Sequence, residues 1–389
     1  MDSGYLERLD AGRFPSPCFV ADEERLRANA ALLDTVQRRT GVKILLALKG
    51  FAMWSMFPLL SRAHGGLLHG TCASSPHEAR LGRQLFGGEV HVFSAGYSDA
   101  DMAEVLDVAD HIVFNSFSQW LRFKDSVQAA PKAIDCGMRI NPEHSEGACA
   151  MYNPCSPNSR LGVRQRHFRP DLLEGISGLH FHTLCEQNSD ALANTLKAVE
   201  ERFGGWMSAM RWINFGGGHH ITRPDYDVDL LCRCIEHVQK SYGVQVYLEP
   251  GEAVALNAGV LLCTVLDIVE AETAIAVLDT SAAAHMPDVL EMPYRPCLIG
   301  AGLPNEKPHT YQLAGKSCLA GDVIGDYSFD RPLAVGERLA FLDMGHYSMV
   351  KTTTFNGLKL PAIASWNPAT GARTIHREFG FDDFMGRLS

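Results

Sequence analysis

Eight short apolar runs alternate with helical patterns over the first two thirds of this 389-residue chain. Strand-forming residues dominate these runs, and capping residues and glycines mark the helices between them. The expected strands are 43–49, 67–73, 90–95, 111–115, 134–141, 179–184, 212–215 and 244–248. Eight strands alternating with helices favour a closed (β/α)8 barrel, the TIM barrel, over an open sheet.

The pattern changes at about residue 261, where short β-rich runs are separated by turn residues. This pattern predicts an all-β second domain that ends in a helix over 381–388. The expected strands of this domain are 261–269, 274–279, 311–315, 338–342 and 358–364.

The Pro-, Asn- and Ser-rich segment 142–160 is too long for an ordinary connection in a barrel, so we expect it to be an active-site loop.

The net charge of -10 argues against nucleic-acid binding, because nucleic-acid-binding proteins usually carry a basic face. No apolar run is long enough to span a membrane. The 11 cysteines are odd in number and have no regular spacing, which is typical of reduced thiols. We therefore expect a cytoplasmic protein with no nucleic-acid and no membrane partner.

Lys49 ends the first apolar run. A charge at the end of a buried run costs free energy unless it has a partner or a chemical role. We interpret Lys49 as a lysine held out of water and directed into a pocket, where desolvation lowers its pKa and a neutral amine can form a Schiff base. The alternative is a lysine that extends from a core strand to solvent.

Gly216, Gly217 and Gly218 follow the seventh expected strand. Glycines let backbone N–H groups approach a phosphate closely, and phosphate often binds at this position in a barrel. The run lacks the spacing and the acidic residue of a dinucleotide motif. We therefore favour a phosphate site, with a flexible turn as the alternative.

His180 and His182 alternate with Phe181 in the sixth expected strand, so the two histidines face the same side. At the mouth of a barrel, His182 can stack on a ring or transfer a proton, and a structurally satisfied histidine is the alternative. Zinc is a weak possibility, because the candidate ligands do not have the spacing of known zinc sites. These candidate ligands are His180, His182, His219, His220 and Cys185.

Glu249 and Glu252 belong to the Glu-Pro-Gly-Glu turn after the eighth expected strand. A buried Glu249 can hold a proton on a pyridine nitrogen, and Glu252 can pair with a cation. Two solvated acids in a turn are the alternative.

Cys318 and Asp322 place a thiol and an acid in a loop of the β-rich region, where an inert cysteine is the usual interpretation.

Taken together, these segments resemble the fold-type III, alanine-racemase-like decarboxylases that use pyridoxal phosphate, a group that includes ornithine and diaminopimelate decarboxylases. The resemblance extends over about residues 14–384, and the set of motifs is specific although no single one is. The segments that carry it are 47–51, 181–186, 216–218, 247–252, 284–288, 315–322 and 347–351.

The resemblance implies that pyridoxal 5'-phosphate is the cofactor. Lys49 would form the Schiff base with it, His182 would stack on its ring, and Glu249 would bind its pyridine nitrogen. The phosphate would be held by Gly217, Gly218 and Tyr347.

The resemblance also implies a head-to-tail homodimer, in which Cys318 completes the partner's site and protonates the product carbon. The barrel would comprise 15–260, and residues 1–14 would join 261–389 in the β domain.

Two departures from the ornithine and diaminopimelate patterns bear on the substrate. Glu252 stands where those enzymes have arginine, and Leu319 follows Cys318 where they have an acid. Scattered carboxylates suit the several ammonium groups of a long carboxylated polyamine. The resemblance, together with these departures, implies decarboxylation of carboxynorspermidine and/or carboxyspermidine to norspermidine and spermidine, in polyamine biosynthesis. The expected substrate-binding residues are Glu252, Asp288, Cys318 and Asp322.

Two other classes of function remain open. One is decarboxylation of a simpler amino acid such as diaminopimelate, or racemisation on the same scaffold, against which Glu252 and Leu319 count. The other is a non-catalytic relative that binds pyridoxal phosphate or polyamines. The presence of both Lys49 and Cys318 counts against it, because a binding protein needs no proton donor.

Overall fold

The computed structural model describes residues 3–147 and 153–389, and the chain divides into two compact units. One unit is Arg27–Val254, and the other comprises the residues up to Leu26 together with Ala255–Ser389. The domain boundaries expected from the sequence were 15–260 for the barrel and 261–389 with 1–14 for the β domain. These boundaries remain predictions.

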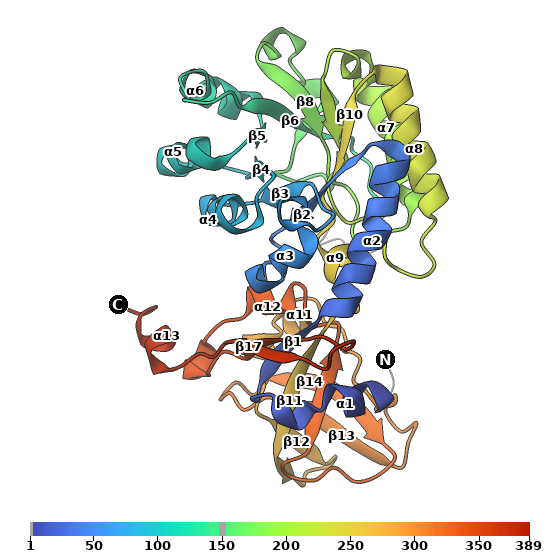
Figure 1. Cartoon of the computed structure of the whole chain (residues 1–389), viewed down its shortest axis with the longest axis vertical. Helices are drawn as coiled ribbons and strands as arrows, with labels where there is room; N and C mark the ends of the chain where they lie inside the picture. The colour runs from blue at the N-terminus through green and yellow to red at the C-terminus, as the bar shows by residue number, and fades with distance from the viewer. Residues whose placement is uncertain (1–2, 148–152) are drawn as a thin grey trace. The chain divides into compact units, whose positions relative to one another are not determined.

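The Arg27–Val254 unit is a closed barrel of eight parallel strands (Figure 1). Each strand pairs with the next barrel strand along the chain, and the last pairs with the first through Tyr247 and Lys43. The predicted (β/α)8 fold is confirmed. The strands are β2 (Lys43–Ala47), β3 (Gly70–Ala73), β4 (Glu89–Phe93), β5 (His111–Phe114), β6 (Asp135–Asn141), β8 (Ile176–His180), β9 (Trp212–Asn214) and β10 (Gln245–Leu248), and the short β7 (Val163–Arg164) pairs with β6.

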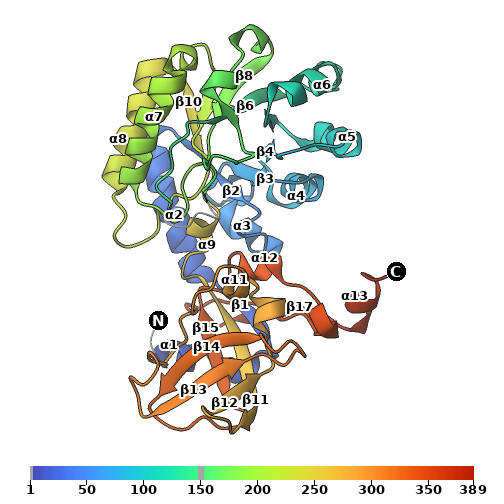
Figure 2. The same ribbon diagram turned by 180° about the vertical axis from the view of Figure 1, so that it is seen from behind.

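Helices lie outside these strands, as Figures 1 and 2 show from opposite sides. Local sequence explains their ends: Ser75 accepts a hydrogen bond from the N–H of Glu78 at the start of α4, and Gly243 ends α8 with a φ of 70°. The helices are α2 (Glu23–Thr40), α3 (Phe57–Leu60), α4 (Pro76–Leu81), α5 (Asp99–Val108), α6 (Phe117–Gln128), α7 (Ser189–Met207), α8 (Val228–Tyr242) and α9 (Glu252–Ala255).

Several barrel strands end earlier than the sequence pattern predicts, and two of these ends bear on the site. The first was expected to reach residue 49, but β2 ends at Ala47, and the sixth was expected over 179–184, but β8 ends at His180. The residues that follow form turns and loops at the mouth of the barrel instead of continuing the ladder. Lys49 and His182 are therefore loop residues, whose side chains need not follow strand alternation.

The other unit is built on a mixed sheet with the strand order β14-β13-β12-β11-β1-β16-β17, and β15 pairs with β11. The predicted all-β character is confirmed, although the pattern missed β1, β14 and β17. The strands are β1 (Cys18–Asp22), β11 (Gly259–Val269), β12 (Ile275–Leu278), β13 (His309–Ala314), β14 (Val323–Phe329), β15 (Arg338–Leu342), β16 (Ala362–Trp366) and β17 (Arg373–Arg377).

The N-terminal segment belongs to this sheet because β1 lies between two later strands. It pairs antiparallel with β11 and parallel with β16. Short helices complete the unit. They are α1 (Ser3–Leu9), α10 (Ala282–His285), α11 (Asp288–Glu291), α12 (Ser348–Lys351) and α13 (Phe381–Met385).

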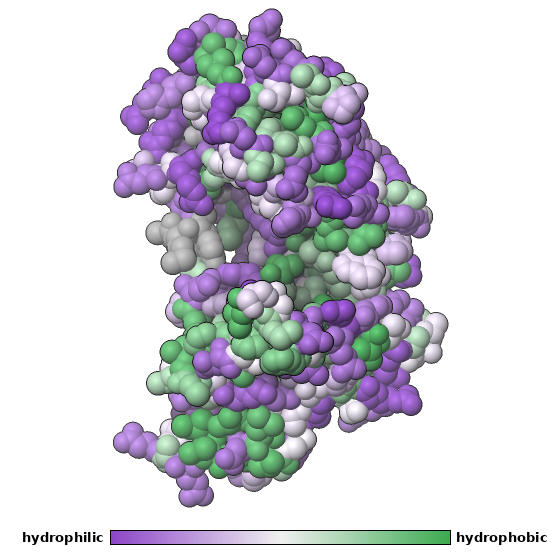
Figure 3. Space-filling view, turned by 90° about the vertical axis from the view of Figure 1, so that its left-hand side faces the viewer, coloured by the Kyte–Doolittle hydropathy of each residue, from purple (hydrophilic) through white to green (hydrophobic). Residues whose placement is uncertain are grey.

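No helix in the described part of the chain is long and apolar enough to cross a membrane. Figure 3 shows hydrophilic side chains over much of one face, with smaller apolar groups between them.

Of the loop predicted over 142–160, residues 148–152 lie outside the described residues. Its C-terminal end is attached to the barrel, since Asn115 Nδ2 donates a hydrogen bond to the carbonyl of Arg160 at 2.8 Å.

Candidate active site

The carboxyl ends of parallel barrel strands converge on one mouth, and the predicted residues of this unit gather there. Lys49 follows β2, His182 follows β8, the glycine run follows β9 and Glu249 follows β10. Burial lowers the pKa of His182 far below its usual value, and the positive charge of Lys49 lowers it further. These two side chains are therefore close enough to interact electrostatically.

Lys49 lies in a turn, not in a strand. The N–H groups of Gly50 and Phe51 both donate to the carbonyl of Ala47, at 3.0 and 3.2 Å, and this turn leaves the Lys49 side chain exposed. The expectation of a lysine held out of water is therefore wrong, because β2 ends before it. The ammonium nevertheless remains near the half-buried Cys72, where its charge opposes the rise that burial causes in the pKa of that thiol.

Glu249 is a buried carboxylate with two well-defined partners. Its Oε1 accepts from Asn214 Nδ2 at 2.7 Å, and its Oε2 lies 3.2 Å from His180 Nε2. Burial alone would raise the pKa of Glu249, but His180 and the Asn214 amide outweigh it and hold the pKa below its usual range. Burial also lowers the pKa of His180, and because an ionised carboxylate can only accept, His180 donates to it through Nε2–H.

The glycine run passes so close to its neighbours that side chains would not fit. Gly216 and Gly218 have φ values of 70° and 80°. A Cβ atom on Gly217 would lie 2.5 Å from the carbonyl oxygen of Glu249, and one on Gly218 would lie 2.0 Å from that of Leu184. The N–H of Gly217 donates to His182 Nδ1 at 3.0 Å, which fixes the orientation of that ring.

In the other unit, Cys318 and Asp322 share the loop between β13 and β14. Cys318 is exposed, and its N–H donates to Asn356 Oδ1 at 2.8 Å. Asp322 is buried, and its carboxylate accepts from Ser281 Oγ at 2.8 Å and from the N–H of Ser317 at 3.2 Å. The structure thus gives Asp322 a structural function in shaping the Cys318 loop, and its predicted contact with substrate stays a prediction.

Asp288 and Tyr347 also lie in this unit. Asp288 pairs with the ammonium of Lys351, which lies 2.6 Å from Glu291 Oε2 as well. Tyr347 precedes α12 with a φ of 45°, a backbone conformation that is uncommon for a non-glycine residue and that often marks functional sites.

Comparison with known proteins identifies the family. A family model described as "Pyridoxal-dependent decarboxylase, C-terminal sheet domain" matches residues 18–345. The chain belongs to the pyridoxal-dependent decarboxylases. The resemblance inferred from the sequence motifs is confirmed, and the protein is a pyridoxal-phosphate-dependent decarboxylase.

Three relatives of this decarboxylase align over nearly its whole length. A carboxyaminopropylagmatine decarboxylase of Synechocystis sp. is 45% identical, over 98% of each chain. A carboxynorspermidine/carboxyspermidine decarboxylase of Campylobacter jejuni is 41% identical, over 96% of this chain and 99% of the relative. A crystal structure of carboxynorspermidine decarboxylase from Campylobacter jejuni, complexed with norspermidine, has 40% identity and a TM-score of 0.88, over 96% of this chain and 99% of that one.

The residues at the mouth fit the cofactor of this family. Pyridoxal phosphate needs an amine, an anionic partner for its ring nitrogen and a backbone cradle for its phosphate. The ionised Glu249 retains free lone pairs beyond its two hydrogen bonds. The glycine run exposes main chain without side chains, and Lys49 is an amine at the same mouth.

Two residues of the site in this decarboxylase belong to no sequence motif. Arg139 lies near the end of the strand expected over 134–141, and no motif marks it: its guanidinium lies 4.4 Å from the centre of the Phe93 ring, which stacks on His180. Burial lowers the pKa of Arg139 to about 10. Asn214 was not singled out, although its position two residues before Gly216 is typical of an Asx turn.

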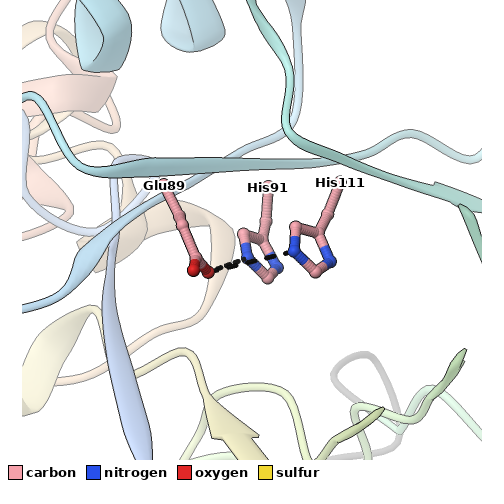
Figure 4. Close-up of side chains that lie close together, drawn as sticks. All are labelled: Glu89, His91 and His111. Atoms are coloured by element: carbon pink, nitrogen blue, oxygen red, sulfur yellow. Dashed lines mark hydrogen bonds and ion pairs between the residues drawn. The ribbon is translucent and has the colours of Figure 1, made fainter. Parts of the chain in front are cut away.

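Two of the candidate zinc ligands, His180 and His182, are instead engaged in hydrogen bonds with Glu249 and Gly217. A separate cluster lies at the opposite, N-terminal end of the barrel, where Glu89, His91 and His111 lie side by side (Figure 4). The two imidazoles stack at 3.8 Å and 10°, so the in-plane lone pairs of their nitrogens do not converge on one point. This cluster therefore fits a structural layer of the barrel better than a metal site.

Proposed function

We propose that this decarboxylase acts on a carboxylated polyamine, carboxynorspermidine and/or carboxyspermidine, and releases CO₂ to give norspermidine or spermidine. The observation that carries the chemistry is the buried, ionised Glu249 beside the glycine run. The substrate class is supported by the relative named for both substrates and by the related structure that holds norspermidine.

The residues at the mouth would bind and orient the cofactor. When bound, pyridoxal phosphate accepts the electron pair that the departing CO₂ leaves at the substrate carbon. Glu249 would keep a proton on the ring nitrogen, Lys49 would provide the amine to which the cofactor attaches, and His182 would stack on the ring. Gly217, Gly218 and Tyr347 would hold the phosphate.

Proton return to the product carbon is assigned to Cys318. The Cys318 thiol is exposed on the unit that contains the mixed sheet, so it is available to a second subunit. We infer a head-to-tail homodimer in which Cys318 of the partner subunit completes each site. The reaction is placed in the cytoplasm, where thiols stay reduced.

The ammonium groups of the substrate would be bound by carboxylates. Glu252 lies in the turn after Glu249, with His220 Nε2 3.3 Å from its Oε1. Asp288 already binds one ammonium, that of Lys351, so a substrate ammonium would bind there by replacing Lys351. Asp322 contributes through the conformation of the Cys318 loop.

A second candidate substrate is carboxyaminopropylagmatine, since the relative at 45% identity is named for it. Such a substrate ends in a guanidinium group, which is planar and can form bidentate hydrogen bonds, whereas the polyamines end in an ammonium. The same residues at the mouth would perform the decarboxylation in either case.

One assay separates these readings. The purified protein, supplied with pyridoxal phosphate, is tested for CO₂ release from carboxynorspermidine, carboxyspermidine, carboxyaminopropylagmatine, diaminopimelate and ornithine. We expect the highest kcat/KM with carboxynorspermidine or carboxyspermidine. Preference for the guanidinium substrate would select the second candidate, and preference for diaminopimelate or no release at all would overturn the polyamine assignment.

A further inference from the structure

Asn214 closes a ring of three hydrogen bonds at the end of β9. Its Oδ1 accepts from the N–H of Gly216 at 2.8 Å, and its Nδ2 donates to Glu249 Oε1 at 2.7 Å. The N–H of Glu249 donates in turn to the carbonyl of Gly216 at 2.8 Å. One side chain thus joins the glycine run to the carboxylate.

The orientation of this amide is set by its partners. A backbone N–H can only donate and an ionised carboxylate can only accept, so Oδ1 must face Gly216 and Nδ2 must face Glu249. Asn214 is completely buried, and water does not compete for either bond. An aspartate of the same shape would satisfy Gly216 but would place a second acceptor against the carboxylate.

The second oxygen of Glu249 is held independently. It faces His180 Nε2, and the His180 ring is itself stacked on Phe93, with ring centres 5.6 Å apart. Each carboxylate oxygen has two lone pairs, and the described side-chain partners of the carboxylate are Asn214, His180 and the Cys72 thiol. An acceptor site therefore remains for a further donor.

We propose that Asn214 is a positioning residue that holds Glu249 at a fixed place relative to the glycine run. A bound pyridoxal phosphate then reaches its ring-nitrogen partner and its phosphate cradle at the same time. This inference rests on the proposed function, because it assigns Glu249 to the ring nitrogen and the glycines to the phosphate.

Two substitutions separate the bonds of Asn214. Asn214→Asp keeps the acceptor for Gly216 and replaces the donor with a carboxylate that faces Glu249. Asn214→Ser keeps a short acceptor for Gly216, as in an ST turn, and is too short to reach Glu249. If the aspartate variant does not fold, the serine variant still tests the bond to Glu249 through the comparison of pyridoxal phosphate with its analogue, without the comparison of pH values.

Asn141 offers a matched control at the end of β6. It is also buried, and its Nδ2 and Oδ1 bond only to main chain, to the carbonyl of Leu161 at 3.0 Å and the N–H of Glu143 at 2.9 Å. Asn141→Asp therefore introduces the same buried acid away from Glu249 and the glycine run.

The experiment measures the Kd of the cofactor-free protein for pyridoxal phosphate and for its 1-deaza analogue, which lacks the ring nitrogen. For pyridoxal phosphate we expect Asn214→Asp to raise the Kd at least about tenfold over wild type at about pH 8.5. The ratio should shrink at about pH 6, because two facing carboxylates then share a proton and the protonated one donates again. With the analogue, the ratio should approach one.

Asn214→Ser should raise the Kd for pyridoxal phosphate without the pH dependence, and Asn141→Asp should change it by less than about twofold. Wild-type protein that does not bind pyridoxal phosphate would overturn the proposed function itself. If wild type binds and the Asn214 variants bind as tightly, or lose both ligands equally at both pH values, the positioning role is wrong while the proposed function stands.

Discussion

Gly50 and Gly251 pack against each other backbone to backbone: a Cβ atom on Gly50 would lie 2.9 Å from the Cα atom of Gly251. Gly50 directly follows Lys49, and Gly251 belongs to the turn that begins with Glu249. The turn that carries the amine and the turn that carries the carboxylate are therefore fastened together by main-chain contact.

Substitution of Gly50 should disturb both turns. Gly50→Ala forces the two backbones apart, and overpacking of this kind costs about 1–3 kcal/mol. We expect a lower Tm and a higher Kd for pyridoxal phosphate. Gly205→Ala in α7 is the control, because nothing lies within 4 Å of its Cβ position, and it should leave both values near wild type. An unchanged Kd in Gly50→Ala would show that the two turns move independently.

Lys49→Ala should abolish decarboxylation and the visible absorbance of the lysine-bound cofactor, because the variant lacks the amine to which we propose that the cofactor attaches. Lys43→Ala is the matched control at the other end of β2, where the ammonium lies 2.7 Å from Glu89 Oε1. That variant should keep the visible spectrum even if its Tm falls. An unchanged visible spectrum in Lys49→Ala would refute the attachment.

The glycine run can be tested against a glycine with the same φ. Gly216 and Gly243 both have a φ of 70°, so alanine at either position suffers the same strain of about 1 kcal/mol. Only at Gly216 does the Cβ atom meet an obstacle, the carbonyl oxygen of Phe181 at 2.5 Å. Gly216→Ala should therefore weaken cofactor binding, measured by titration of the cofactor-free protein, while Gly243→Ala should not. Equal losses would point to strain alone.

Glu252→Gln should raise KM for carboxylated polyamines, because it weakens a charge-assisted contact of about 1–3 kcal/mol with a substrate ammonium. Steady-state kinetics with carboxynorspermidine check this, and the Kd for pyridoxal phosphate should stay near that of wild type. If cofactor binding weakens and every substrate suffers equally, Glu252 serves the cofactor and not the substrate.

His111 should make the barrel sensitive to acid. Burial, with the charge of His91, lowers its pKa to about 2, against an unfolded value of about 6.5. As pH falls, the unfolded chain binds a proton at His111 before the folded chain does. His111 therefore makes its full contribution to the free energy of unfolding above the unfolded pKa. This contribution is lost at up to about 1.4 kcal/mol per pH unit as pH falls towards the folded pKa.

Urea unfolding between about pH 7.5 and pH 4.5 tests this, since His111→Phe keeps a ring against His91 and removes the titration. The variant should lose less stability on acidification than wild type. His64→Phe, at an exposed position, should follow the wild-type curve. A parallel curve for His111→Phe would assign the acid sensitivity to other groups.

The sequence by itself determined the barrel, the β-rich second domain and the family. These features depend on local signals: the alternation of apolar runs with helices, glycines where main chains touch, and a Glu-Pro-Gly turn at a strand end. Such signals survive in the linear order because each depends on neighbouring residues. The same signals placed Glu249 and the glycine run at strand ends, where the structure has them.

Only the tertiary structure decided what these residues touch. The partners of Glu249 are Asn214 and His180, which lie 35 and 69 residues away in the chain. The exposure of Lys49 and the burial of Asp322 likewise depend on where turns leave the sheet. Closure of the barrel brings distant strand ends together at one mouth, and the resulting contacts depend on strand register and turn geometry, which no local pattern specifies.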